Sequence, residues 1–239
     1  MLTLRAGMVG EQPFKDQDMT SVRDALRTRF SCRRFLPKAV PRETIEAILT
    51  TAQMTPSWCN TQPWEIILLS GEEVGRLADK LYAHAATGVK ATPDFAFPAR
   101  YEGVYRDRRK VCGVQLYQSL GIGKDERGKA AEQALENFRF FDAPHVMLIT
   151  TAEDLGVYGA VDCGLYVSAF ILAARELGID TIPQAAVASY PDLLREHLGI
   201  PPVRKFLCGI SFGYADGAHP VNAYRTERAA LADVIDWRG

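Results

Sequence analysis

Short apolar runs along the chain predict its strands. Trp64–Leu69 (WEIILL), His145–Thr151 (HVMLITT) and Arg204–Gly213 (RKFLCGISFG) are largely apolar, and turn-forming residues bound them. Runs of this length and composition favour buried strands. Thr181–Val187 is expected to be extended as well, and Leu231–Trp237 has the composition of a further strand in the tail.

Apolar residues spaced three and four apart predict helices. One is expected over Thr20–Thr28 with Thr20 or Ser21 as its N-cap, and a second begins at Pro41. The longest candidate is Gly156–Leu177, whose many small residues would let another helix approach closely. The remaining helical stretches are Glu72–Ala86, Val111–Leu120, Glu126–Phe140 and Pro191–Leu198.

The order of these elements favours the α+β class. Helices outnumber strands and do not alternate strictly with them, as they would in a doubly wound sheet. At 239 residues and 47% hydrophobic content, the chain fits one domain with an ample core. Residues 1–18 lack periodicity and are expected to be a loosely held leader. Thr87–Asp107 contains Pro93 and Pro98 and is expected to be a loop or a broken helix.

Composition and charge exclude several other classes of protein. The net charge of -1 gives no electrostatic reason to bind nucleic acid or an anionic membrane. No apolar run approaches the ~20 residues that span a bilayer, and the start lacks the features of a secretory signal. The five cysteines are scattered without a CxxC pair, and the four histidines show no ligand spacing. These features predict a cytoplasmic protein with reduced thiols and no metal site.

A basic cluster follows the first predicted helix, at Arg29-Phe30-Ser31-Cys32-Arg33-Arg34. Guanidinium groups are planar, permanently charged donors that suit a phosphate, and the Ser31 hydroxyl can add a neutral donor. By composition alone, a solvated basic turn would have the same sequence.

A rigid polar loop precedes the first predicted strand, at Thr55-Pro56-Ser57-Trp58-Cys59-Asn60-Thr61-Gln62-Pro63-Trp64. Its two prolines restrict the backbone and oppose a regular helix. The side chains of Ser57, Asn60 and Gln62 offer donors and acceptors that suit a flat heterocycle. A capped turn before a strand is the alternative, and Cys59 is expected to be a buried, inert thiol.

Five motifs in this order together resemble the nitroreductase family of flavoproteins from about residue 20 onwards. The basic cluster resembles the family's N-terminal signature, and the polar loop resembles its Pro-Ser-x-x-Asn-x-Gln-Pro-Trp motif. The later matches are Asp162-x-Gly164 on the long helix, Ile182-Pro183-Gln184-Ala185-Ala186, and the tail Asn222-x-x-Arg225-x-x-Arg228.

The resemblance implies an FMN site built from several segments. Its residues would be Arg29, Phe30, Ser31 and Arg33 at the phosphate and ribityl chain, with Arg225 or Arg228 closing from the tail; Pro56, Ser57, Asn60 and Gln62 from the partner subunit; and Pro183, Gln184, Ala185 and Ala186 beside the ring. The chain departs from the family where Ala185-Ala186 replaces Glu-Gly, so backbone N–H groups remain there without a carboxylate.

The resemblance also implies the architecture. It is a nitroreductase-like mixed sheet flanked by helices, in a domain-swapped homodimer with a C-terminal arm. Residues 19–215 would form the FMN domain, with a flap at about 95–137, and residues 216–239 would form the arm that crosses to the partner.

The implied activity is reduction of nitroaromatic compounds or quinones by NAD(P)H, with ping-pong hydride transfer through flavin N5. Phe97, Tyr101 and Tyr105 would contact a small aromatic acceptor, although they also suit a flap core. No separate catalytic side chain is expected, because the flavin carries the chemistry. The alternatives are a reductive dehalogenase or flavin-fragmenting enzyme of the same fold, and a flavin-binding protein without turnover.

Overall fold

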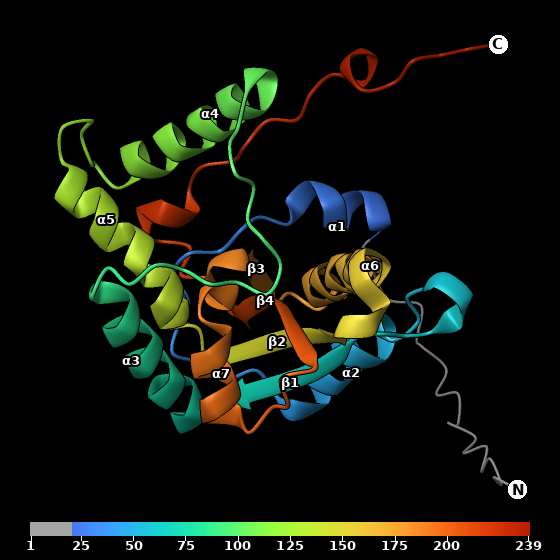
Figure 1. Cartoon of the computed structure of the whole chain (residues 1–239). Coiled ribbons are helices and arrows are strands. Elements are labelled where there is room, and N and C mark those ends of the chain that lie inside the picture. The colour runs from blue at the N-terminus through green and yellow to red at the C-terminus, as the bar shows by residue number, and fades with distance from the viewer. Residues whose placement is uncertain (1–20) are drawn as a thin grey trace, which may run out of the picture.

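A four-stranded sheet forms the centre of the computed structural model, which describes residues 21–239 (Figure 1). The strands are β1 (Glu65–Ser70), β2 (His145–Ala152), β3 (Asp180–Gln184) and β4 (Arg204–Gly213), in the order β1-β2-β4-β3. Every neighbouring pair is antiparallel. The expected mixed sheet is therefore antiparallel in these strands, and among the described residues parallel pairing is limited to an isolated bridge between Ser31 and Thr181.

Seven α-helices surround the sheet in the described part of the chain. They are α1 (Val22–Thr28), α2 (Arg42–Ala52), α3 (Glu72–Ala86), α4 (Gly103–Ser119), α5 (Arg127–Leu135), α6 (Gly156–Glu176) and α7 (Pro191–Leu198). Ser21 caps α1 as predicted, since its side chain accepts a hydrogen bond from the Asp24 N–H. The single helix predicted over Glu126–Phe140 is wrong beyond Leu135. There the chain continues as a 3-10 segment, η2 (Glu136–Asp142), in which Phe140 and Phe141 adopt positive φ angles of 57° and 54°.

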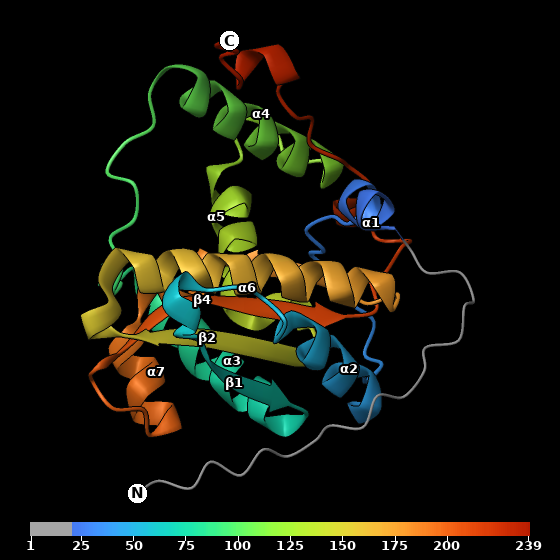
Figure 2. The same ribbon diagram turned by 90° about the vertical axis from the view of Figure 1, so that its right-hand side faces the viewer.

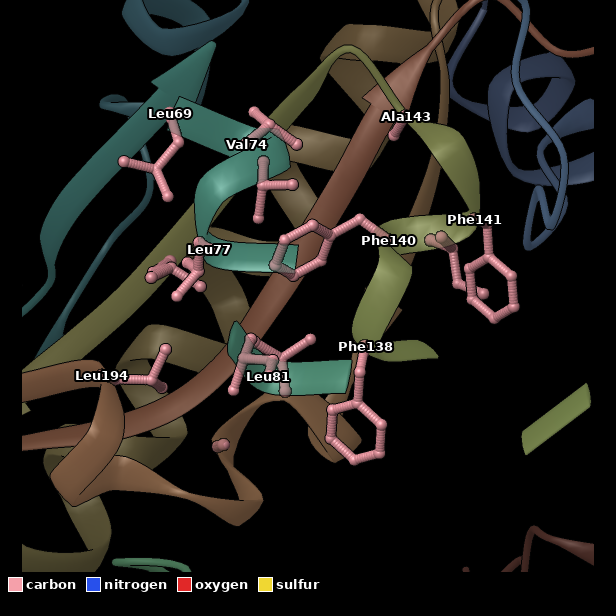
Figure 3. Close-up of a cluster of buried hydrophobic side chains, with 14 of the residues drawn as sticks. Leu69, Val74, Leu77, Leu81, Phe138, Phe140, Phe141, Ala143 and Leu194 are labelled. Atoms are coloured by element: carbon pink, nitrogen blue, oxygen red, sulfur yellow. The ribbon is translucent and has the colours of Figure 1, made fainter. Parts of the chain in front are cut away.

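Two hydrophobic cores hold the helices against the two faces of the sheet. β2 is buried on both faces, so its alternate residues enter different cores: Val146 and Leu148 face one, and Met147 and Ile149 face the other. The first core contains residues of α3, η2 and α7 (Figure 3): Leu77, Leu81, Phe138, Phe140 and Leu194. The second core contains residues of α2 and α6: Ile45, Ile48, Tyr166 and Phe170. Helix α6 runs along this face of the sheet (Figure 2).

Helix α6 is more apolar than its packing on the sheet requires. Glu153–Glu176 is long and apolar enough to cross a membrane by length and composition, contrary to the expectation that no run approaches that length. Only 39% of its most apolar window is buried. At Gly159 the helix lies against β2, where an added Cβ would come within 2.7 Å of the Thr151 hydroxyl oxygen. The close approach predicted for another helix is made here to the chain's own sheet.

Two parts of the chain stand away from the sheet. Helices α4 and α5 bury none of their residues completely, and α4 and the tail lie beyond the body of the fold (Figures 1 and 2). In the single chain the strand-like segment Leu231–Trp237 contains the 3-10 helix η6 (Leu231–Asp233). The leader predicted at residues 1–18 lies outside the described residues.

Candidate functional site

One cleft gathers the phosphate-binding residues predicted from the sequence. It is lined by Arg29, Phe30, Ser31, Arg33, Cys112, Tyr224, Arg225, Thr226 and Arg228. The sequence left open whether Arg225 or Arg228 closes the site, and both side chains line the cleft. Its cavity volume is about 150 Å³, below the roughly 300–1,000 Å³ of common small-molecule sites. The cleft thus suits the anionic end of a larger ligand.

Local backbone structure places the basic segment at the edge of the sheet. Helix α1 ends at Thr28, and Arg29 is extended at its C-cap. The Cys32 N–H then donates to the Thr181 carbonyl at 3.0 Å. The turn out of the helix is thereby fixed against β3, and its side chains remain free to line the cleft.

Asn222 joins the tail to the basic segment across about 190 residues of sequence. Its side-chain oxygen accepts a hydrogen bond from the Arg33 N–H at 2.8 Å, and its side-chain nitrogen donates to the Arg34 carbonyl at 2.8 Å. The side chain is buried. These bonds set the position of the tail arginines relative to Arg29.

The electrostatics of the cleft favour an anion. Burial, and then the charges of Arg228 and Arg225, lower the pKa of the Arg29 guanidinium, which stays charged at neutral pH. None of the lining residues is acidic. Within residues 21–239, none of the four arginines of the cleft forms an ion pair with a carboxylate. The buried Nε of Arg29 has no hydrogen-bond partner among the described residues.

Two aromatic rings hold arginines at the rim of the cleft. The Arg225 guanidinium lies 3.9 Å from the centroid of the Phe30 ring, and Arg33 Nη1 donates to the Tyr224 hydroxyl at 2.8 Å. Such contacts fix a guanidinium without neutralising it. Phe30 is therefore a support for Arg225 in this chain.

The polar loop lies in a different part of the molecule, and it is tightly organised. Cys59, Asn60 and Gln62 have φ angles of 50°, 55° and 46°, a region that costs energy for residues other than glycine. The buried Asp162 carboxylate of α6 accepts a hydrogen bond from the Trp58 N–H at 3.1 Å. Asn60 and Gln62 are exposed and do not line the arginine cleft. One chain therefore does not bring these predicted site residues together.

The segment at Pro183–Ala186 offers backbone groups rather than side chains. Pro183 and Ala185 are exposed at the junction of β3 with the 3-10 helix η4 (Ala185–Ser189). The first N–H groups of a helix have no partner within it. By contrast, the Gln184 side chain is buried, where it donates to the Asn137 carbonyl at 2.9 Å and accepts from the Ser211 hydroxyl at 2.5 Å. It is committed to the core, which the sequence did not indicate.

The flap aromatics are neither core nor part of the cleft. Phe97, Tyr101 and Tyr105 are 40%, 42% and 68% exposed, and Tyr101 has the Arg109 guanidinium 5.1 Å from its ring centroid. The flap reaches the cleft through Cys112 of α4 instead. The sequence did not predict Cys112, Tyr224 and Thr226 as site residues. Tyr224 and Thr226 adjoin Arg225 in the sequence, and this was the only signal that could have suggested them.

Comparisons with known proteins find similar sequences over most of the chain. A model of the nitroreductase family matches residues 26–214. The chain is 39% identical over 210 residues to nitroreductase NfnB of Mycolicibacterium smegmatis, covering 87% of this chain and 88% of that protein. It is 35% identical over 202 residues to 4-nitrobenzoate reductase of Pseudomonas putida, covering 84% and 88%.

Solved structures show the same similarity. The FMN-dependent nitroreductase NfnB from Mycobacterium smegmatis in complex with NADPH aligns with a TM-score of 0.85 and 36% identity, over 91% of this chain and 97% of that one. The FMN and NADPH-dependent nitroreductase NfnB from Sphigopyxis sp. strain HMH aligns with a TM-score of 0.88 and 31% identity, over 92% and 99%.

Proposed function

Because this chain belongs to the nitroreductase family, we propose that it is an FMN-dependent enzyme that reduces nitroaromatic compounds with NAD(P)H. The observation that carries the proposal is the cleft in which Arg29, Arg33, Arg225 and Arg228 meet without a carboxylate partner among residues 21–239. The relative named 4-nitrobenzoate reductase, and the solved nitroreductases described with FMN and NADPH, support the same reaction.

The residues of the cleft fit the phosphate end of FMN. Arg29, whose buried Nε has no partner in the described chain, and the tail arginines supply permanent charge, and the Ser31 hydroxyl adds a neutral donor. Phe30 and Tyr224 keep two of the guanidinium groups in place. Bound FMN would supply the two-electron chemistry between the nicotinamide and the acceptor.

The other residues of the chain act by orientation and electrostatics. The N–H groups that begin η4, at Ala185 and Ala186, are donors suited to negative charge that develops on a neighbouring ring. Pro183 fixes the backbone before them. No side chain is assigned as the donor of the protons that nitro-group reduction consumes.

A second copy of the chain would complete the site. Val157, Val161 and Leu165 lie at intervals of four residues on α6, and they are 68%, 52% and 46% exposed. This apolar face continues to the polar loop, because the Trp58 and Tyr158 rings are 4.3 Å apart. If the same face of another copy covers this apolar face of α6, its exposed side chains are removed from water. The loop with Pro56, Ser57, Asn60 and Gln62 would then reach the partner's FMN.

The tail is proposed to clasp the partner. Leu231, Val234 and Trp237 are 64%, 63% and 81% exposed on a segment that extends beyond the body of the fold. Residues 216–239 would form this arm, residues 19–215 would form the FMN domain, and residues 95–137 would form a flap. The arm is expected to dock through its apolar side chains, without the strand first predicted for it.

Purification and steady-state kinetics test the proposal. The protein should purify yellow and release FMN on heating, and NADPH or NADH oxidation should accelerate when a nitroaromatic compound is added. Parallel double-reciprocal lines are expected for a ping-pong order. In Arg29→Ala with Arg33→Ala, FMN affinity should fall about 10–100-fold, the equivalent of losing one charged hydrogen bond. Unchanged FMN affinity in this double variant would overturn the assignment, and bound FMN without turnover would favour a carrier.

A further inference from the structure

A chain of four side chains runs in one direction through the base of the polar loop. The Trp64 indole N–H donates to Gln53 Oε1 at 3.1 Å, and Gln53 Nε2 donates to Gln62 Oε1 at 3.0 Å. Gln62 Nε2 then donates to Asn60 Oδ1 at 3.2 Å. We name this chain the amide relay.

The first member of the amide relay decides the orientation of all the others. An indole nitrogen only donates, so Gln53 must turn its oxygen toward Trp64 and its NH2 group toward Gln62. The same reasoning then turns the Gln62 oxygen toward Gln53, and its NH2 group toward Asn60. Because the Trp64 ring is 7% exposed and packs 4.9 Å from the Tyr166 ring, the donor at the start of the relay is fixed by the core.

The far end of the amide relay presents donors to the outside. The Asn60 oxygen accepts the bond from Gln62, and among the described residues its NH2 group has no partner, so the exposed side chain can turn its donors outward. Ser57 has the same polarity, since its oxygen accepts from the Gln62 N–H at 2.9 Å and its hydroxyl proton has no partner in the described part of the chain. Bonds aligned in one direction also polarise each other and strengthen the last donor.

We infer that Gln53 and Trp64 are positioning residues that turn the amide NH2 groups of the loop toward the carbonyl oxygens of the flavin ring. This inference rests on the proposed function, in which the loop faces FMN. Neither residue touches the flavin itself. They act through Gln62 and Asn60, and the reduced ring gains more from these donors because it carries more negative charge.

Reversing the amide relay is the test. In Gln53→Glu both carboxylate oxygens accept, so Gln62 turns to donate to position 53 and its oxygen faces Asn60, which then presents its own oxygen outward. Gln53 is exposed, so the fold tolerates the change. FMN affinity should fall about tenfold, roughly the loss of one hydrogen bond. Reduced FMN should lose about tenfold more, which lowers the two-electron reduction potential by about 30 mV.

Three further variants separate polarity from charge and packing. Met54 is 82% exposed, and Met54→Glu adds the same charge beside the relay. The reduction potential of FMN bound to this variant should therefore stay near that of the wild type. Gln53→Met removes the relay without charge, and Trp64→Phe removes only the fixed donor. Both should weaken FMN binding less than Gln53→Glu does.

The outcomes discriminate between this inference and the proposed function. A wild-type protein that binds no FMN overturns both. Wild-type FMN affinity and potential in Gln53→Glu overturn the amide relay alone, as does an equal shift in Met54→Glu, because charge would then explain the effect.

Discussion

Asn222→Ala should weaken the fold and FMN binding together, because this side chain holds the two halves of the arginine cleft. It accepts from the Arg33 N–H and donates to the carbonyl oxygens of Arg34 and Asp216, at 2.8, 2.8 and 2.9 Å. At about 0.5–1.5 kcal/mol for each net hydrogen bond, the three bonds contribute about 1.5–4.5 kcal/mol to the free energy of unfolding. The FMN dissociation constant should rise by about tenfold, equivalent to about 1.4 kcal/mol.

Urea unfolding followed by circular dichroism measures the first effect, and fluorescence titration with FMN measures the second. Asn222→Asp keeps the acceptor for Arg33 but turns the donor into an acceptor that faces two carbonyl oxygens, so it should be at least as unstable. Ala223→Ser, at the exposed neighbouring residue, is the control and should behave as the wild type. An Asn222→Ala protein within about 0.5 kcal/mol of the wild type, with unchanged FMN affinity, would refute the reasoning.

Three further predictions concern other parts of the molecule. Burial lowers the pKa of His145, so the unfolded chain binds a proton at a higher pH than the folded chain does. The free energy of unfolding should therefore decrease as the pH falls below about 6.5. Urea unfolding across this range measures the effect, and a His145→Phe variant should lose this pH dependence. Truncation after Gly217 should weaken the dimer and release FMN, which size-exclusion chromatography and flavin absorbance would show. A truncated protein that stays dimeric and yellow would contradict the proposal that the arm holds the partner. Three single variants test the flap: Phe97→Ala, Tyr101→Ala and Tyr105→Ala. Each should keep FMN and change the preference between a nitroaromatic and a quinone about 2–10-fold in kcat/KM. Unaltered preference or lost flavin would instead show that the flap has a structural role.

Local sequence determined most elements of this protein. Helices α3 and α7 and strand β4 have their predicted bounds, because their apolar spacing and their flanking Gly or Pro residues act within a few positions. The family motifs also pointed to Arg29, Ser31 and Arg225, which the structure brings to one cleft.

Elements whose conformation depends on distant contacts were predicted less well. η2 leaves the helical path because Phe140 and Phe141 enter the core around α3, which outweighs their local helical pattern. Leu231–Trp237 has the composition of a strand, but a strand needs a neighbour, and the described chain offers it none.

Only the tertiary structure decided which polar groups are free. Gln184 belongs to a motif beside the proposed flavin, yet its amide is used by Ser211 and Asn137, whereas the buried Nε of Arg29 finds no partner among residues 21–239. Likewise, Asn222 connects the tail to Arg33 through bonds that no local spacing encodes. The physical reason is that sequence fixes which donors and acceptors exist, while packing between distant segments determines which of them the fold itself consumes.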